Sequence, residues 1–176
     1  MGLLCLDAHL DVEESYGTMP KVWHGNPFRT LIDEGLLDGE NMVTIGPHGL
    51  IDKKWIDYIR EKNIRLFTAQ EVKKQGMDEV IEQAIACLRE RCKSIYLTFD
   101  IDCIDPAQAP GTSTPWVGGL KAEEVISAMR QLSDLPVKAF DMVEVNPQFD
   151  PSGRTSILAS DIIWNYLSFG FPKKQQ

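Results

Sequence analysis

The sequence predicts an α/β protein in which a mostly parallel sheet lies between two layers of helices. Two observations support this three-layer α-β-α arrangement. Short apolar stretches rich in Val, Ile, Leu and Phe alternate with segments whose apolar residues recur at helical spacing. Apolar strands separated by helices are typical of right-handed βαβ units, whose parallel sheet is covered on both faces.

Each expected strand is a short apolar run bounded by breakers or polar residues. The expected strands are residues 3–6, 42–45, 64–67, 95–99 and 137–145. The expected helices are residues 27–37, 52–62, 77–92, a segment beginning at 121, and 155–169. Residues 77–92 follow the i, i+3, i+4 template most closely, and Pro27 is suited to the first position of its helix. Residues 1–176 contain no repeat or linker and form one domain.

Composition argues against some classes of function. A net charge of −8 argues against binding to a nucleic-acid backbone. No apolar run approaches the roughly 20 residues of a membrane span, and the first residues do not resemble a secretory signal. The four cysteines lack C-x-x-C spacing, which favours reduced thiols and a cytoplasmic location.

The clearest chemical signal is the end of the strand at residues 95–99. Asp100 and Asp102 follow it, and the side-chain period of two places both on one face of an extended chain. Two ionised carboxylates at the end of an apolar strand repel each other unless a cation neutralises them. A solvated acidic turn is the alternative interpretation.

A second cluster strengthens the interpretation as a metal site. Asp7, His9 and Asp11 follow the apolar strand 3–6 and also share a face. Carboxylates mixed with an imidazole suit a divalent ion of intermediate hardness such as Mn²⁺. Five candidate ligands, from two strands of one sheet, match two ions that share carboxylates.

Further motifs follow in chain order. They are His24-Gly25-Asn26-Pro27-Phe28-Arg29, Asp100-x-Asp102-x-x-Asp105-Pro106, Ala109-Pro110-Gly111-Thr112-Ser113-Thr114-Pro115, Gly118-Gly119-Leu120 and Asp141-Met142-Val143-Glu144-Val145-Asn146-Pro147. Together with Asp7-Ala8-His9-x-Asp11, this ordered set resembles the ureohydrolase family, which includes arginases, agmatinases and formimidoylglutamases. Each motif alone is weak, but the ordered set is specific.

The resemblance implies an arginase-like fold and two Mn²⁺ ions per site. Asp7 and Asp100 are then expected to bridge the ions. His9 and Asp102 are expected to complete the coordination of one ion, and Asp11 is expected to bind the other.

The resemblance also assigns the groups that handle the substrate. It implies that Glu144 orients the guanidinium, that Thr114 contributes to substrate binding, and that His24 transfers protons to the leaving amine. A surface acid and an ordinary loop histidine are the alternative interpretations of Glu144 and His24. The implied partners are a small guanidine or amidine substrate and further copies of the chain, with no nucleic acid and no membrane.

One family motif is missing. Family members place Gly-Gly-x-His on a strand before the Asp-Ala-His-x-Asp strand, and that histidine binds the same ion as Asp11. Only six residues precede Asp7 here. The expectation is therefore an N-terminally truncated domain with one incomplete metal position and an exposed sheet edge.

The expected activity is agmatinase-like, with urea released from a linear guanidine. Arginases hold the amino-acid head of arginine with an Asn in the loop after Asp-Ala-His-x-Asp, and residues 12–17 contain none. Glu13 and Glu14 favour an amine-tailed cation instead. The alternatives are a formimidoylglutamase-like or other guanidino-acid hydrolase, and an inactive remnant that only binds metal or a partner. A metal-dependent phosphatase is a distant third, because no phosphate-binding loop is present.

Overall fold

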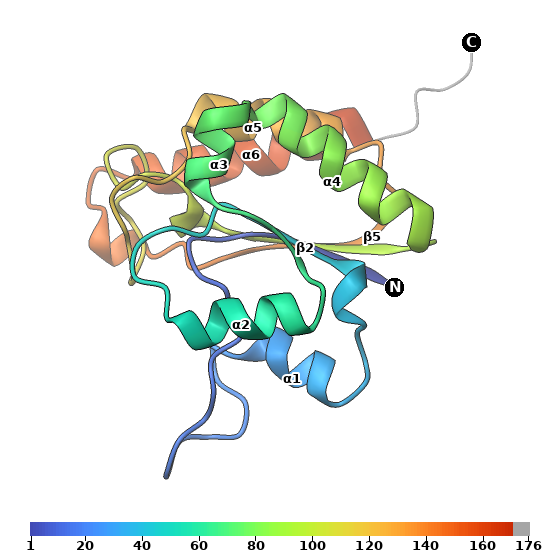
Figure 1. The fold of residues 1–176 in the computed structure, drawn as a ribbon. Helices are drawn as coiled ribbons and strands as arrows, with labels where there is room; N and C mark the ends of the chain where they lie inside the picture. Colours follow the sequence, from blue (N-terminus) through green and yellow to red (C-terminus); the bar gives the residue numbers. More distant parts are fainter. Residues whose placement is uncertain (171–176) are drawn as a thin grey trace.

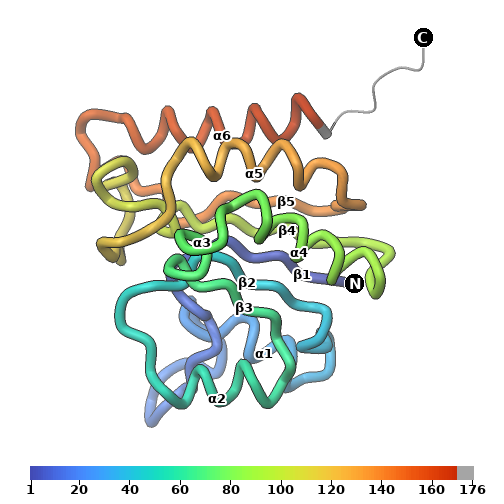
Figure 2. The backbone as a smooth tube through the Cα atoms, turned by 45° about the horizontal axis from the view of Figure 1, so that its top comes forward, coloured from blue at the N-terminus to red at the C-terminus, as the bar shows by residue number. Residues whose placement is uncertain are grey.

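The computed structural model describes residues 1–170, and its centre is a five-stranded parallel sheet. The strands are β1 (Gly2–Leu6), β2 (Met42–Ile45), β3 (Arg65–Phe67), β4 (Ile95–Asp100) and β5 (Val137–Val143). Their order across the sheet is β3-β2-β1-β4-β5, which Figure 2 shows from β3 at the bottom to β5 near the top. The predicted α/β class with a parallel sheet is confirmed.

Helices cover both faces of the sheet (Figure 1). One layer holds α1 (Pro27–Asp33) and α2 (Lys53–Glu61). The other layer holds α3 (Ala69–Gln75), α4 (Met77–Arg91), α5 (Ala122–Leu132) and α6 (Arg154–Gly170). Three short 3₁₀ helices lie at residues Gly39–Asn41, Ile101–Cys103 and Pro147–Phe149.

Strand β1 separates two hydrophobic cores. Leu4 and Leu6 face the core beneath α4 and α5, whereas Leu3 and Cys5 face the core beneath α1 and α2. All five residues of β1 are buried, as expected for a central strand whose two faces are both covered.

The strand register brings the carboxyl ends of neighbouring strands level. Leu6 of β1 lies beside Ile45 of β2 and Phe99 of β4, and Phe99 lies beside Met142 of β5. Leu6, Phe99 and Met142 thus lie side by side at the carboxyl end of the sheet. Acids that follow β1 and β4 therefore lie at one edge of the sheet, where ligands bind in open α/β folds.

Several boundaries differ from the prediction. The helix that begins at Pro27 ends at Asp33 rather than at residue 37, because Gly35 adopts a left-handed φ of 71° that ends the turn. Residues 69–75 form α3, which was not predicted. Thr68 and Glu71 form a capping box at its start, a signal that is readable in the sequence as T-x-x-E.

Within the described residues, β5 is an edge strand that pairs only with β4. Ala139, which lies beside Tyr96 of β4, is exposed, as is Val143. The expected exposed sheet edge is present on this side.

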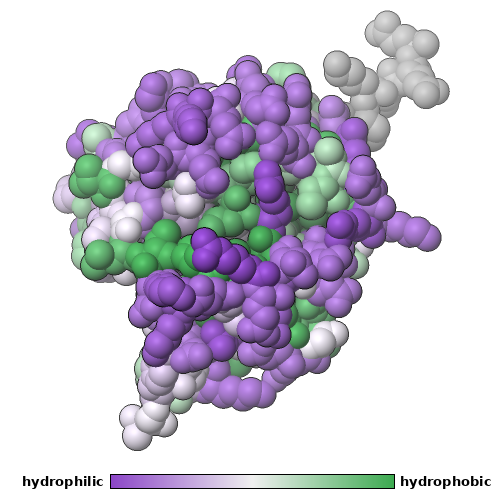
Figure 3. Space-filling model, viewed as in Figure 1, coloured by the Kyte–Doolittle hydropathy of each residue, from purple (hydrophilic) through white to green (hydrophobic). Residues whose placement is uncertain are grey.

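The viewed surface is mostly hydrophilic, with apolar side chains in a band between the two helical layers (Figure 3). None of the helices within residues 1–170 is both long and apolar enough to cross a membrane. All four cysteines are free thiols, as expected.

Candidate functional site

A cavity of about 590 Å³ opens where β1, β4 and β5 end. It lies between the strand ends and α1, and Phe28 and Leu31 of α1 form part of its apolar wall. All eight residues predicted for the site line this cavity: Asp7, His9, Asp11, His24, Asp100, Asp102, Thr114 and Glu144. Their roles in catalysis stay predictions.

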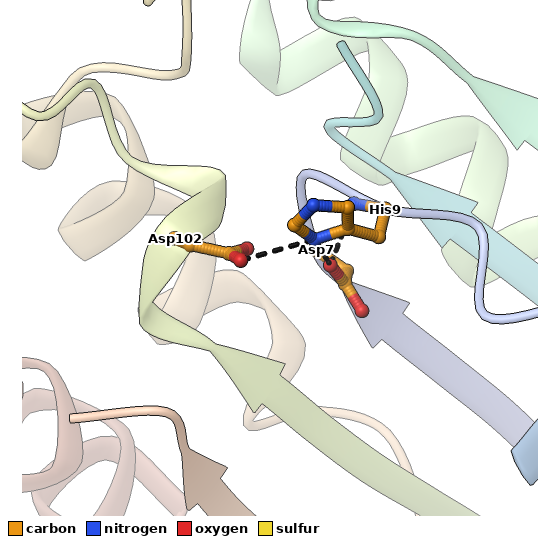
Figure 4. Close-up of side chains that lie close together, drawn as sticks. All are labelled: Asp7, His9 and Asp102. Atoms are coloured by element: carbon orange, nitrogen blue, oxygen red, sulfur yellow. Dashed lines mark hydrogen bonds and ion pairs between the residues drawn. The ribbon is translucent and has the colours of Figure 1, made fainter. Parts of the chain in front are cut away.

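Three of these residues form a close group. The potential metal-binding atoms of Asp7, His9 and Asp102 all lie within 4.8 Å of one another. Nδ1 of His9 is 3.0 Å from an oxygen of Asp102 and 3.4 Å from an oxygen of Asp7 (Figure 4). Two carboxylates and one imidazole are a donor set that suits Mn²⁺ or a similar divalent cation.

Backbone hydrogen bonds hold the close group between two central strands. The N–H of Ala8 donates to Asp102 at 3.0 Å, which ties the end of β1 to the end of β4. The N–H of His9 donates to Asp7 at 2.7 Å, and the N–H of Asp7 donates to the carbonyl of Ile45 at 3.1 Å. Ala8 is fully buried, so the side chains before and after it turn toward the cavity.

Asp100 and Asp102 reach the cavity by a different geometry from the one predicted. Strand β4 ends at Asp100, and residues Ile101–Cys103 form a 3₁₀ turn rather than a continued strand. The turn forms because the Asp100 carboxylate caps it, accepting a hydrogen bond from the N–H of Asp102 at 2.9 Å. Asp100 and Asp11 line the cavity but lie outside the close group of three.

The electrostatics of the cavity favour a bound cation. Burial raises the pKa of Asp7 to about 6, and burial together with Asp7 raises the pKa of Asp11 to about 9 and that of Asp100 to about 10. Although burial alone would raise the pKa of Asp102, the hydrogen bond from His9 holds it below its usual range.

Within residues 1–170, no Lys or Arg side chain pairs with these four acids. His9 is the positively charged side chain that pairs with these acids, because its hydrogen bonds to Asp102 and Asp7 raise its pKa. Asp7, Asp100 and Asp102 are buried and Asp11 is half-buried, and without a cation the raised pKa values of Asp11 and Asp100 keep these two carboxyls protonated at neutral pH. A divalent cation would replace those protons. The residues therefore fit a divalent cation.

Glu144 follows β5 in a left-handed conformation, with φ of 60°, that turns it out of the strand and into the cavity wall. The Ser113 hydroxyl donates to Glu144 at 2.7 Å. The next residue, Thr114, donates to Asp102 at 3.3 Å. Ser113 and Thr114 thus connect the exposed Glu144 to Asp102 of the buried close group.

The loop before α1 contributes His24 and Glu13 to the cavity. The N–H of Glu13 donates to the carbonyl of Gly25 at 2.9 Å, so the first and last parts of this loop lie side by side. The expectation that Glu14 acts beside Glu13 at the cavity is wrong, because Glu14 does not line the cavity. Glu14 points to the outside, where it pairs with Arg29 at 3.2 Å and accepts a hydrogen bond from Tyr16.

Two residues near the site were not predicted from the sequence. The indole N–H of Trp116 lies 3.2 Å from Nε2 of His9. His48 places its ring nitrogens 2.8 Å from the carbonyls of Gly46 and Trp116. No sequence motif indicates the Trp116 contact, because it joins residues that are 107 positions apart.

Comparison with known proteins identifies relatives of this chain. The chain is 40% identical over 166 residues to proclavaminate amidinohydrolase of Streptomyces clavuligerus, an alignment that covers 92% of this chain and 51% of that protein. It is 37% identical over 174 residues to the agmatinase of Escherichia coli O7:K1, covering 99% of this chain and 53% of the agmatinase. The chain thus spans about half the length of these relatives.

The solved structure of the S. clavuligerus amidinohydrolase superposes with a TM-score of 0.87 at 38% identity, covering 97% of this chain and 55% of that one. A sequence model of the Arginase family matches residues 1–168, nearly the whole chain. The protein therefore belongs to the arginase family.

Proposed function

We propose that this chain forms the cation-binding and guanidinium-binding part of a manganese-dependent hydrolase that releases urea from a linear guanidine. The observation that carries the proposal is the shared cavity, in which the acids beside His9 face Glu144. Asp7, His9 and Asp102 would hold the cation, with Asp11 and Asp100 beside them. When bound, such a cation supplies an activated water for attack on the guanidine carbon.

The chain's own residues would orient the substrate. A guanidinium is a planar fork of donors, and a carboxylate is the acceptor that matches it. Glu144 is suited to this task because it stands at the cavity wall, and Ser113 fixes one of its oxygens. His24, exposed at the same wall, is placed to pass a proton to the leaving amine.

Glu13 supports agmatine as the substrate class. It lines the cavity, whereas Glu14 does not, and burial raises the pKa of Glu13. A carboxylate at this position attracts the amine tail of agmatine and repels the carboxylate of arginine or of a guanidino acid. The similarity to an agmatinase supports the same choice.

Urea release with a panel of substrates tests the proposal. We expect this chain to hydrolyse agmatine slowly in the presence of Mn²⁺, because the nitrogen ligand implied by the resemblance must come from outside these residues. Glu144→Gln should lower the rate about 10–100-fold, since it replaces a charged acceptor of the guanidinium by a neutral one. Added chelator should remove the activity.

The control is Glu14→Gln, which changes an acid of the neighbouring loop outside the cavity. Cleavage of formimidoylglutamate but of no guanidine would contradict the substrate class while leaving the mechanism in place. Mn²⁺ binding without hydrolysis of any amidine, even after addition of an upstream Gly-Gly-x-His segment, would favour the inactive remnant.

Glu13→Gln should change the substrate preference. Without the carboxylate, the preference for agmatine over guanidinobutyrate should fall about 5–50-fold, mainly through a higher KM for agmatine. Glu14→Gln is again the matched variant, because its carboxylate is engaged by Arg29 outside the cavity. An unchanged ratio of kcat/KM values for the two substrates would show that Glu13 does not select the tail.

A further inference from the structure

Two segments at the cavity wall are joined to each other by two hydrogen bonds. One is the loop of residues 111–114, and the other begins with Glu144. The hydroxyl of Ser113 donates to Glu144 at 2.7 Å, and the N–H of Asn146 donates to the carbonyl of Gly111 at 2.7 Å. The position of Gly111 therefore determines where Ser113 lies relative to Glu144.

A hydroxyl from α6 fixes Gly111 on its other side. The N–H of Gly111 donates to Oγ1 of Thr155 at 2.9 Å, and the Thr155 hydroxyl donates its own proton to Asp150 at 2.8 Å. Thr155 and Asp150 are 1% and 4% exposed, so an unpaired N–H at this place would be costly. A Cβ at Gly111 would come within 2.9 Å of both side chains, so the loop can approach α6 this closely only with a glycine.

The Thr155 hydroxyl is not required to hold the start of α6. The N–H of Thr155 donates to the same oxygen of Asp150 at 2.8 Å, and this bond keeps the helix and Asp150 together without the hydroxyl. Further along α6, Ala159, Ile162 and Tyr166 lie in the hydrophobic core. The helix is therefore a fixed support, and the lone pair of the hydroxyl serves the loop.

We propose that the Thr155 hydroxyl positions the acid that binds the guanidinium. It holds Gly111 at the place from which Ser113 reaches Glu144, so Thr155 is a positioning residue that acts through the loop. This role rests on the proposed function, in which Glu144 receives the guanidinium. The close group is held separately, by a hydrogen bond between the ends of β1 and β4, so its affinity for Mn²⁺ should not depend on Thr155.

Thr155→Val tests this role, because valine has nearly the same shape as threonine and lacks the hydroxyl. We expect kcat/KM for agmatine hydrolysis with Mn²⁺ to fall about 3–10-fold, the size of one lost hydrogen bond. Thr155→Ser keeps the hydroxyl and should restore the value of the unmodified chain. Ser160→Ala is the matched control, because it removes an exposed hydroxyl of α6 that donates to the carbonyl of Ser156 in the same helix.

Calorimetric titration with Mn²⁺ separates this role from a general loss of structure. The Mn²⁺ affinity of Thr155→Val should stay within about twofold of that of the unmodified chain, because sites without shared partners act independently. An unchanged kcat/KM in Thr155→Val would overturn the role. An equal fall in Thr155→Ser would also overturn it, as would a loss of Mn²⁺ affinity as large as the fall in kcat/KM.

A second measurement needs no substitution. Because coupling between two events is reciprocal, a hydrogen bond that strengthens agmatine binding must itself be strengthened by bound agmatine. In hydrogen exchange followed by mass spectrometry, saturating agmatine with Mn²⁺ should slow exchange in the peptide that contains Gly111 about 3–10-fold. An unchanged rate would overturn the role of Thr155 alone. If the unmodified chain neither binds nor hydrolyses agmatine, this role and the proposed function are overturned together.

Discussion

Asp102→Asn should reduce the affinity for Mn²⁺ more than 100-fold. The change removes one negative charge from the close group and leaves the side chain the same size. The amide oxygen can still accept the hydrogen bond from the N–H of Ala8, so the ends of β1 and β4 should stay joined. Changes to residues that only orient a metal ligand already cost about 10–100-fold, and Asp102 lies in direct contact with His9.

Calorimetric titration with Mn²⁺ measures this effect, and circular dichroism confirms that the variant folds. Asp105→Asn is the matched control. It changes an acid three residues away that does not line the cavity and that accepts hydrogen bonds from Ala107 and Gly118. If Asp102→Asn bound Mn²⁺ as tightly as the unmodified chain, the close group would not be the cation site.

The cation-free protein should lose stability as the pH rises from 5 to 8. Asp11 and Asp100 have folded-state pKa values of about 9 and about 10, far above the value of 3.8 expected in the unfolded chain. In this window the folded protein retains protons that the unfolded chain releases, so its free energy of unfolding falls with pH. The raised pKa of His9 acts in the same direction above pH 6.5.

Each retained proton changes the free energy of unfolding by about 1.4 kcal/mol per pH unit, so we expect a loss of at least about 4 kcal/mol over three units, the amount for one of the two acids. Urea unfolding at several pH values in the presence of a chelator measures it. Asp11→Asn should flatten the profile, and saturating Mn²⁺ should remove most of the loss because the cation replaces the retained protons. A stability that rises from pH 5 to 8 would mean that these acids are not buried together.

The fold could be predicted from the sequence because its central strands are largely apolar. Residues 3–6 are all apolar, and residues 95–99 are apolar except for Tyr96 and Thr98, so both runs predicted burial by helices on both sides. The helix ends were harder to place. The helix from Pro27 was predicted too long because Leu37 continues the apolar pattern, although it enters the core from a loop after Gly35.

The site was predicted as a set of residues but not as a geometry. The period of two correctly placed Asp100 and Asp102 at one cavity, although a capped 3₁₀ turn and not a strand brings them there. The positions of Glu14 and Trp116 depend on contacts with residues distant in the sequence, Arg29 in one case and His9 in the other. Linear spacing carries no information about such contacts.

The edge position of β5 implies that the two parts of the cavity differ in local stability. Asp7 and Asp102 follow strands that have neighbours on both sides, whereas Glu144 follows the edge strand of the described sheet. Edge strands detach in partial openings that leave the centre of a sheet intact. In native-state hydrogen exchange, amides of β5 should therefore exchange before those of β1. A transient opening of β5 would move Glu144 away from the cavity while the close group of Asp7, His9 and Asp102 stays assembled.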